Sequence, residues 1–302
     1  MKNLNEFNVF MDVKKNLSQN TLRSYDRIIS NMLNYFNVEN IDQYNKLSLL
    51  DFEKYLNTVF DNPNQTMSKY KDNEKLRNNS YNTTLCILKV FANWLCERNF
   101  SEENPLKKLK YKKKQRINVI SLREEEREAM IRAAKGLDQK IRVGLMAWLG
   151  LRRFELMDIK TSDIIDGHLV FEGKGDKEAK LEIPPFLLEM IQEYLSTRDF
   201  ESEYLLVSKV GKNKLTNGTS IYNNIKKIAR DAGIPESKLH LVAPHTLRRT
   251  FACRAVENGT SPYVVKDMMR HSSIHTTNLY LEAMGIESAN TAIRNQPVPN
   301  WR

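Results

Sequence analysis

The sequence predicts a mainly α-helical protein of two domains, an N-terminal helical bundle and a C-terminal α+β domain with a small antiparallel β-sheet. Three observations support this fold class. Every strongly periodic segment before residue 109 has helical spacing, a single hairpin pattern follows near residue 175, and the remaining long segments are again helical. At 302 residues and 41% hydrophobic content, the chain is long enough for two domains that each bury a core.

The N-terminal domain is predicted from three helical segments. Residues 18–36, SQNTLRSYDRIISNMLNYF, open with a serine or asparagine suited to capping a helix and then repeat apolar residues at three- and four-residue steps. The segments 47–60 and 81–100 repeat this pattern. No glycine precedes Gly136, which suits a compact helical module with few tight turns. We therefore assign residues 1–109 to this domain.

A basic run, KKLKYKKKQR, follows at 107–116 and contains seven basic residues in ten. A like-charge run of this kind is usually a solvated linker that repels itself into an extended form. Alternatively, it is a strap that runs along phosphates between two domains holding a DNA duplex. We assign residues 110–119 to the linker. The candidate DNA-binding residues are its cations, Lys107, Lys108, Lys110, Lys112, Lys113, Lys114 and Arg116.

The second domain is expected over residues 120–302, with a C-terminal tail at 281–302. Its first helix is predicted in SLREEEREAMIRAA, with Ser121 as the cap and Glu124 in the capping-box position. Further helices are predicted in PPFLLEMIQEYL, SIYNNIKKIARDAG, TLRRTFACRAVENG, PYVVKDMMRH and SIHTTNLYLEA.

A β-hairpin is predicted within this domain. Apolar, β-branched stretches at 168–172 and 180–184 flank a Gly-Lys-Gly-Asp turn, the chemistry that a hairpin requires. In the turn, Lys174 lies between two glycines, and Lys177 and Lys180 follow. Most lysines in such turns only improve solubility, so the lysines alone do not indicate a site.

Composition narrows the classes of partner. The chain has 47 Lys and Arg against 37 Asp and Glu, a net charge of +10 and a pI near 9.3, which favours a polyanion such as nucleic acid or an anionic lipid surface. The N-terminus shows no apolar signal segment, and the longest apolar run, VGLMAWLGL, is too short to span a bilayer. Three cysteines without a CxxC pair suggest neither a disulfide framework nor a zinc knuckle. We expect a soluble cytoplasmic protein.

Two arginine-containing motifs lie at the edges of apolar helices. In LGLRRFELMDIK, Glu155 follows Arg152 by three residues, and an arginine at an apolar edge should be paired or functional because an unpaired buried guanidinium is costly. In PHTLRRTFACR, His245 and Arg248 are three residues apart and project from the same helical face, where they could grip one phosphate. The alternative is that His245 caps a helix and the arginine pairs with an acid.

A third motif, MMRHSSIHTTNLYLEA, places His271 after an apolar helix and Tyr280 nine residues later. In the order in which they occur, GLRRFEL, GKGDK, HTLR and HSSIHTTNLY resemble the catalytic domain of the tyrosine recombinases, the phage-integrase family of site-specific DNA recombinases. The resemblance implies a SAM-like, helical core-binding domain ahead of the catalytic one, the two closing around DNA as a clamp.

The resemblance also implies the site residues. Two of them, Arg152 and Arg248, have permanently charged guanidinium groups that can donate two hydrogen bonds at once. Such groups suit the negative charge that develops on the non-bridging phosphate oxygens. The matching positions are Arg152, Lys174, His245, Arg248, His271 and Tyr280, with Glu155 as a supporting residue that orients an arginine or histidine.

The remaining roles follow from proton chemistry. Tyr280 is the implied nucleophile, and a phenol with a pKa near 10 needs proton removal, for which His245 has the appropriate ordinary pKa. Lys174 is the candidate acid that protonates the departing 5′-oxygen, since neighbouring cations can lower its pKa. His271 would hydrogen-bond the phosphate.

The implied function is a site-specific recombinase or integrase that cleaves and rejoins DNA through a 3′-phosphotyrosine intermediate, exchanging strands between two short sites. No Walker-type loop, HExxH motif or zinc spacing occurs, so we expect no ATP, metal or other cofactor. The expected partners are double-stranded DNA, three further copies in a homotetramer on two sites, and an accessory DNA-bending or directionality protein. We expect the protein to be associated with the nucleoid.

Alternatives remain open at this stage. A type IB topoisomerase or telomere resolvase shares the chemistry, and a DNA-binding regulator of the same fold would lack catalysis. The neighbouring Arg153 and Arg249 allow a one-residue shift in the arginine assignments, while Lys177 and Tyr263 are rivals for the acid and the nucleophile. Arg270 stands where the family usually has glycine, which leaves the geometry around the following histidine open.

Overall fold

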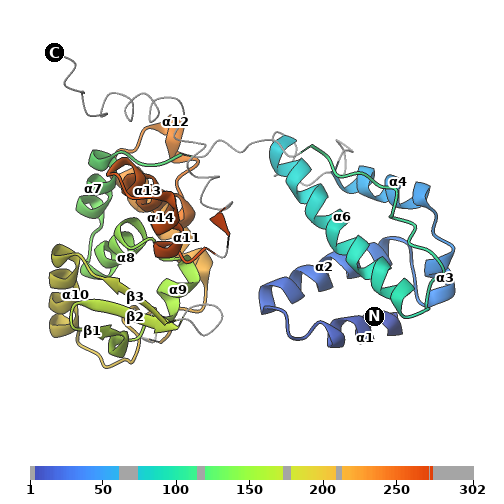
Figure 1. Cartoon of the computed structure of the whole chain (residues 1–302), viewed down its shortest axis with the longest axis horizontal. Coiled ribbons are helices and arrows are strands. Elements are labelled where there is room, and N and C mark those ends of the chain that lie inside the picture. The colour runs from blue at the N-terminus through green and yellow to red at the C-terminus, as the bar shows by residue number, and fades with distance from the viewer. Residues whose placement is uncertain are drawn as a thin grey trace, which may run out of the picture. The chain divides into compact units, whose positions relative to one another are not determined.

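The structure is a computed structural model that describes residues 4–60, 74–113, 120–172, 178–208, 213–271 and 273–274. It divides into two compact units, Met1–Ile117 and Asn118–Arg302 (Figure 1). The mainly helical fold class with one small antiparallel sheet is confirmed. Within the described residues, no helix has both the length and the apolar character needed to cross a bilayer.

The N-terminal unit is a bundle in which α1, α2 and α4 all pack against α6 (Figure 1). Ser18 caps α2 as predicted, because its hydroxyl accepts a hydrogen bond from the backbone N–H of Thr21 at 3.2 Å. In the core, the ring of Phe10 lies 5.1 Å from that of Phe91 and 5.4 Å from that of Trp94. The helices are α1 (Asn5–Val13), α2 (Gln19–Tyr35), α3 (Ile41–Asn45), α4 (Leu49–Phe60) and α6 (Glu74–Glu97).

The second unit is built around α8, which packs against α7, α10 and α13 (Figure 1). Residues 141–147 of α8 are all buried, as expected of a helix surrounded by others. Gly144 allows α10 to approach closely, because a Cβ there would lie 2.6 Å from a methyl carbon of Leu187. The helices are α7 (Glu124–Ala133), α8 (Leu137–Trp148), α9 (Arg153–Asp158), α10 (Pro185–Thr197), α11 (Gly218–Asp231), α12 (Glu236–Leu239), α13 (Pro244–Glu257) and α14 (Pro262–Met268).

The predicted hairpin is confirmed as part of a three-stranded antiparallel sheet of order β1-β2-β3, with Leu169 opposite Leu181. The second strand, predicted at 180–184, starts and ends two residues earlier, because Pro184 already forms the N-cap of α10. The connecting turn, residues 173–177, lies outside the described residues. The strands are β1 (Ile164–Ile165), β2 (His168–Glu172) and β3 (Glu178–Glu182), and a short 3-10 turn, η1 (Thr161–Asp163), precedes them.

The predicted start of the first helix of this unit was wrong. Ser121 and Glu124 do not form the cap; instead Arg123 is the N-cap, and the carboxylate of Glu126 accepts its backbone N–H at 2.7 Å. Leu122 is fully buried and donates its backbone N–H to a threonine hydroxyl of α13 at 2.9 Å. This tertiary hydrogen bond holds the preceding residues against α13 and delays the helix by two residues.

A left-handed turn at Gly150 ends α8 and positions the first arginine motif. Gly150 has φ +65°, a conformation that favours glycine. A Cβ at this position would lie 2.5 Å from the Phe251 ring and 3.1 Å from the Met269 sulfur. The backbone therefore requires glycine here, and the turn leads directly to Arg152 at the N-cap of α9.

Replacing Gly150 by alanine should destabilise the second unit through both backbone strain and overpacking, together about 2–4 kcal/mol. Gly233→Ala is the matched control, because Gly233 also has positive φ (+70°) but open space around it. Its cost should be the strain alone, about 1–2 kcal/mol. Urea unfolding of the two variants measures the difference. Equal decreases in the free energy of unfolding would show that close packing at Gly150 contributes nothing.

Candidate active site

The start of α9 holds Arg152 against Glu155. The Glu155 carboxylate accepts the backbone N–H of Arg152 at 2.7 Å with one oxygen and pairs with its guanidinium Nη1 at 2.6 Å with the other. One carboxylate thereby caps the helix and orients the arginine side chain. The Arg152 side chain remains 43% exposed, so its guanidinium is available to a ligand.

Arg248 is the most deeply buried cation of the site, with a side chain only 2% exposed. From α13, its two terminal nitrogens donate hydrogen bonds to the backbone carbonyls of Gly150 and Met269. The nearest Glu155 oxygen lies 3.8 Å from its Nη1. Because a buried guanidinium requires hydrogen-bond acceptors and a counter-charge, these contacts fix the turn after α8 and the turn after α14 to α13.

The turn after α14 carries His271. The backbone N–H of Arg270 bonds the carbonyl of Asp267, and that of His271 bonds the carbonyl of Lys266, so α14 ends in a Schellman motif. Arg152 Nη2 donates to the carbonyl of Arg270 at 2.9 Å. The structure therefore brings the sequence-predicted residues of three separate motifs together, around Glu155 and this turn.

His245 lies in the first turn of α13, one position after Pro244 and three before Arg248. Part of the side chain is exposed, but the surrounding protein removes enough water that desolvation lowers the pKa of His245 to about 4. The positive charges of Arg249, Arg248 and Arg152 lower this pKa further. The imidazole is consequently neutral at pH 7 and has a ring nitrogen that can accept a proton.

His271 is buried, with 8% of its surface exposed. Desolvation is the main cause that lowers the pKa of His271 to about 4, and Arg248 and Arg152 contribute as nearby positive charges. Burial of Glu155 by itself raises its pKa, but Arg270 and Arg152 outweigh that effect and leave the pKa lowered. At neutral pH the described part of the site therefore combines charged arginines, one carboxylate and two neutral imidazoles.

The neighbouring arginines donate to other backbone carbonyls, and Arg249 also lies close enough to His245 to lower its pKa. Arg153 donates to the carbonyl of Gly218 at 3.4 Å, at the start of α11. Arg249 donates to the carbonyl of Ile120 at 3.4 Å. Of the two arginine pairs, Arg152 and Arg248 are thus the members that contact Glu155 and the turn before His271.

Several predicted positions lie outside the described residues: Lys174 and its rival Lys177, Tyr280, and the linker residues Lys114 and Arg116. The rival tyrosine, Tyr263, is 71% exposed on α14.

One residue of the site was not among the predicted site residues. Arg270 Nη2 pairs with Glu155 at 2.7 Å, across 115 residues of sequence. The only sequence signal was an arginine where the resembling family usually has glycine.

Residues 107–113, the described part of the basic run, are not a free linker. Asn82 of α6 bonds both backbone groups of Lys112 at 2.8 Å, and Lys89 Nζ donates to the carbonyl of Leu109 at 2.7 Å. Leu109 of this segment and Leu106 just before it are buried in the N-terminal core, which anchors the segment along α6. Of the two alternatives for the basic run, the free, solvated linker does not hold for residues 107–113, because these hydrogen bonds anchor them. The exposed lysines of this segment are Lys107, Lys108, Lys110 and Lys113.

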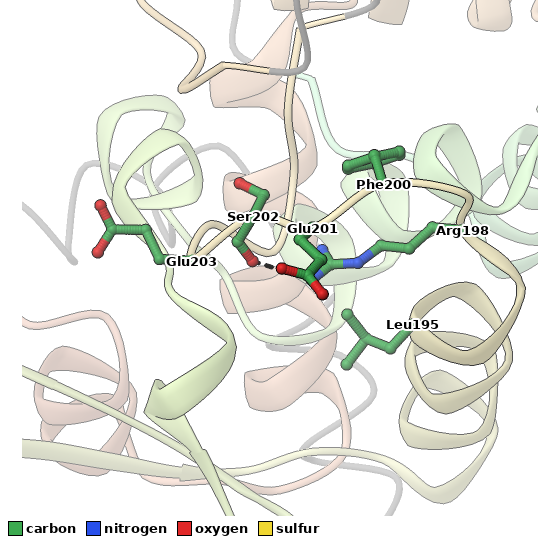
Figure 2. Close-up of a pocket in the computed structure, with 6 residues that line it drawn as sticks. All are labelled: Leu195, Arg198, Phe200, Glu201, Ser202 and Glu203. Atoms are coloured by element: carbon green, nitrogen blue, oxygen red, sulfur yellow. Dashed lines mark hydrogen bonds between the residues drawn. The ribbon is translucent and has the colours of Figure 1, made fainter.

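An open hollow of about 600 Å³ beside α10 is lined by none of the predicted site residues (Figure 2). Arg198 crosses it and donates to the carbonyls of Ser202 and Tyr204 at 2.9 and 3.2 Å, which holds the loop after α10 in place. Among the described residues, no three His, Cys, Asp or Glu side chains gather into a group that could hold a metal.

Comparisons with known proteins agree with this organisation. The family model described as the phage integrase family matches residues 121–284. The model described as the phage integrase N-terminal SAM-like domain matches residues 4–99. Together the two models cover both units of the chain.

Relatives of one class, the tyrosine recombinases, match this chain over most or about half of its length. A tyrosine recombinase of Thermosipho africanus is 28% identical over 271 residues, which is 87% of this chain and 89% of the relative. The tyrosine recombinase XerA of Thermococcus onnurineus is 39% identical over 141 residues, 45% of this chain and 48% of the relative. Among solved structures, a lambda integrase tetramer bound to a Holliday junction has a TM-score of 0.69 at 15% identity, covering 91% of this chain and 76% of that one. On these matches the chain belongs to the phage integrase family and is a tyrosine-type site-specific DNA recombinase.

Proposed function

We propose that this recombinase cleaves and rejoins DNA one strand at a time through a 3′-phosphotyrosine formed on Tyr280. The observation that carries the proposal is the convergence of Arg152, Arg248 and the His271 turn around a single carboxylate, Glu155. Transesterification retains the energy of the broken phosphodiester in the protein linkage, so strand joining requires no ATP.

The arginines stabilise the charge that develops on the phosphate. Arg152 is the accessible donor, and Glu155 keeps its fork oriented. Arg248 adds a permanent positive charge from beneath, and its role in holding Gly150 and Met269 keeps the pocket preorganised. Preorganisation matters because donors already in position need not reorganise as the charge appears.

Two side chains transfer protons, and a third holds the phosphate. His245, neutral at pH 7, accepts the phenolic proton of Tyr280 as the phenol attacks phosphorus. Lys174 protonates the departing 5′-oxygen, and His271 hydrogen-bonds a non-bridging oxygen. A bound phosphate also offsets the arginine charges that depress the pKa of His245, so substrate binding makes this histidine a stronger base.

Both units are proposed to hold double-stranded DNA, with the anchored lysines of residues 107–113 contacting phosphates. A homotetramer on two short sites, assisted by an accessory DNA-bending or directionality protein, would exchange the strands. The lambda integrase structure is a tetramer on a Holliday junction, and its fold matches this chain. We place the protein in the cytoplasm at the nucleoid.

Tyr280→Phe should abolish the covalent protein–DNA adduct while leaving DNA binding intact, because only the attacking oxygen is removed. The adduct is detected as a denaturant-stable, gel-shifted species on genomic fragments, and sequencing its DNA ends identifies the sites. Tyr263→Phe is the matched control and should form the adduct normally. An adduct that survives in Tyr280→Phe reassigns the nucleophile, and relaxation of plasmids that lack a site contradicts site specificity.

The neutral histidines predict a pH dependence of stability. His271 has a pKa of about 4 in the folded protein and about 6.5 when unfolded, so between these values the unfolded chain binds more protons. The free energy of unfolding should therefore rise with pH through this window, by about 2 kcal/mol from pH 5 to pH 7 for His271.

Urea unfolding of wild type and His271→Gln at the two pH values checks this sign, and His240→Gln, outside the arginine cluster, is the control. The rise should be smaller in His271→Gln by about the stated amount. An unchanged rise in that variant would mean that His271 is not held neutral by the folded protein.

Phosphate contacts by the anchored lysines predict steep salt dependence of DNA binding. Replacing Lys108 and Lys110 by glutamine should lower the slope of log Kd against log salt by about 0.9 for each phosphate that is no longer neutralised. Lys15→Gln is the control, since Lys15 lies two residues after the end of α1 and pairs with Asp12 at 3.5 Å. Fluorescence anisotropy with a duplex carrying a recovered site gives the slopes. A slope that does not change in the double variant would remove these lysines from the interface.

A further inference from the structure

Arg270 occupies an unfavourable backbone position. It is the left-handed residue of the Schellman motif that ends α14, with φ +53°. Glycine is the usual residue at this position of the motif, because a side chain there crowds the backbone. An arginine at such a site needs a compensating interaction of its side chain.

The side-chain contacts of Arg270 supply that interaction. Its Nη2 pairs with Glu155 Oε2 at 2.7 Å, and its Nη1 donates to the carbonyl of Met268 at 3.0 Å. The side chains of the pair are only 12% and 21% exposed. Because water has little access, this ion pair is screened less than one on the surface.

Glu155 thus joins two turns that are distant in the sequence. Its Oε1 holds the Arg152 guanidinium, while its Oε2 accepts both the Arg152 backbone N–H and the Arg270 guanidinium. In return, Arg152 Nη2 bonds the Arg270 carbonyl at 2.9 Å. The contacts form a closed ring of three residues.

We propose that Arg270 is a positioning residue of the recombinase site, which fixes the turn carrying His271 to the turn carrying Arg152 through its ion pair with Glu155. This inference rests on the proposed function of that site. Arg270 acts through Glu155 rather than on the reacting atoms.

The electrostatics of the pocket agree with this role. Arg270 is the strongest of the positive charges that lower the pKa of Glu155, and it is one of those that lower the pKa of His271. Removing Arg270 would leave Glu155 with Arg152 as its nearest partner in the ring. The Arg152 guanidinium would then be drawn further toward the carboxylate. The His271 turn would lose its side-chain link to α9 and keep only the bonds from Arg152 Nη2 to the backbone carbonyls of the turn.

The test compares Arg270→Gly with wild type in single-turnover adduct formation, at saturating protein, on a nicked duplex carrying a site recovered from trapped adducts. Glycine relieves the backbone strain, which stabilises the protein, and removes the ion pair, which destabilises it, so the two effects on stability oppose each other. We expect the rate constant of cleavage to fall on the order of 10- to 100-fold, because misplacing a reacting group slows the reaction by such a factor. The Kd for the duplex should stay within about twofold of wild type. Arg270→Lys, which retains a charge, should recover part of the rate.

Asp166→Gly is the matched control for the backbone. Asp166 also has positive φ (+48°) and lies in the exposed turn between β1 and β2, away from the arginines. This variant should raise the thermal midpoint and leave the cleavage rate unchanged. If Arg270 were strained but had no role in positioning the site, Arg270→Gly would also raise the thermal midpoint and leave the cleavage rate unchanged. That result would overturn the proposal.

A second measurement needs no DNA. The pKa of His271, followed by NMR and assigned with His271→Gln, should rise in Arg270→Gly because a positive charge and the close packing of the turn are removed. An unchanged pKa would overturn the proposal independently of catalysis. If the wild-type protein forms no adduct, the proposed function of the site is overturned instead. This outcome distinguishes a failure of the proposed function from a failure of the positioning role.

Discussion

The site depends on the burial of one guanidinium. Arg248 has almost no exposed surface, and a buried cation is tolerated only where acceptors surround it. The acceptors are the carbonyls of Gly150 and Met269, which belong to turns that end α8 and α14. Satisfying Arg248 therefore forces both turns against α13. The accessible Arg152 and the buried His271 follow these turns directly, so their separation is set by the hydrogen bonds of a third residue.

The charge balance of the pocket follows from the same arrangement. In the described part of the site, three arginines face one carboxylate, and the two histidines are neutral at pH 7. Glu155 offsets part of this charge but leaves an excess of positive charge, which a phosphodiester can neutralise. Desolvation is the main cause of the lowered histidine pKa values, and the closeness of the arginines adds a further electrostatic cost. An anionic substrate offsets the arginine charges. The same charges that bind the phosphate therefore allow its binding to make His245 a stronger base.

Sequence patterns predicted the parts of the molecule that depend on local chemistry. The Ser18 cap and the strand at 168–172 follow from side-chain periodicity and from residues a few positions apart. Arg152 pairs with Glu155 because residues at i and i+3 meet at a helix start, a spacing that the sequence shows directly. The order of the motifs along the chain, and the spacing of the residues within each motif, indicated the family.

What sequence could not predict depends on contacts between distant segments. The first helix of the second unit starts at Glu124 because the buried Leu122 is bonded to α13, 128 residues away in sequence. The basic run could not be distinguished from a free linker, because its anchors, Asn82 and Lys89, are on a helix that precedes it. In both cases the local pattern misled the prediction, because a long-range hydrogen bond decided the outcome.

Position 270 shows how one local rule can be exchanged for a long-range contact. A glycine there would satisfy the Schellman motif at no conformational cost, but it would leave Glu155 without its partner on the His271 turn. Arginine brings strain and gains a buried partner on another turn. Arginine in place of glycine stabilises the assembled pocket and not α14 itself. It is therefore an advantage only where the geometry of the pocket matters. The departure from the family pattern therefore lies where an ion pair joins the turn before His271 to the turn that carries Arg152.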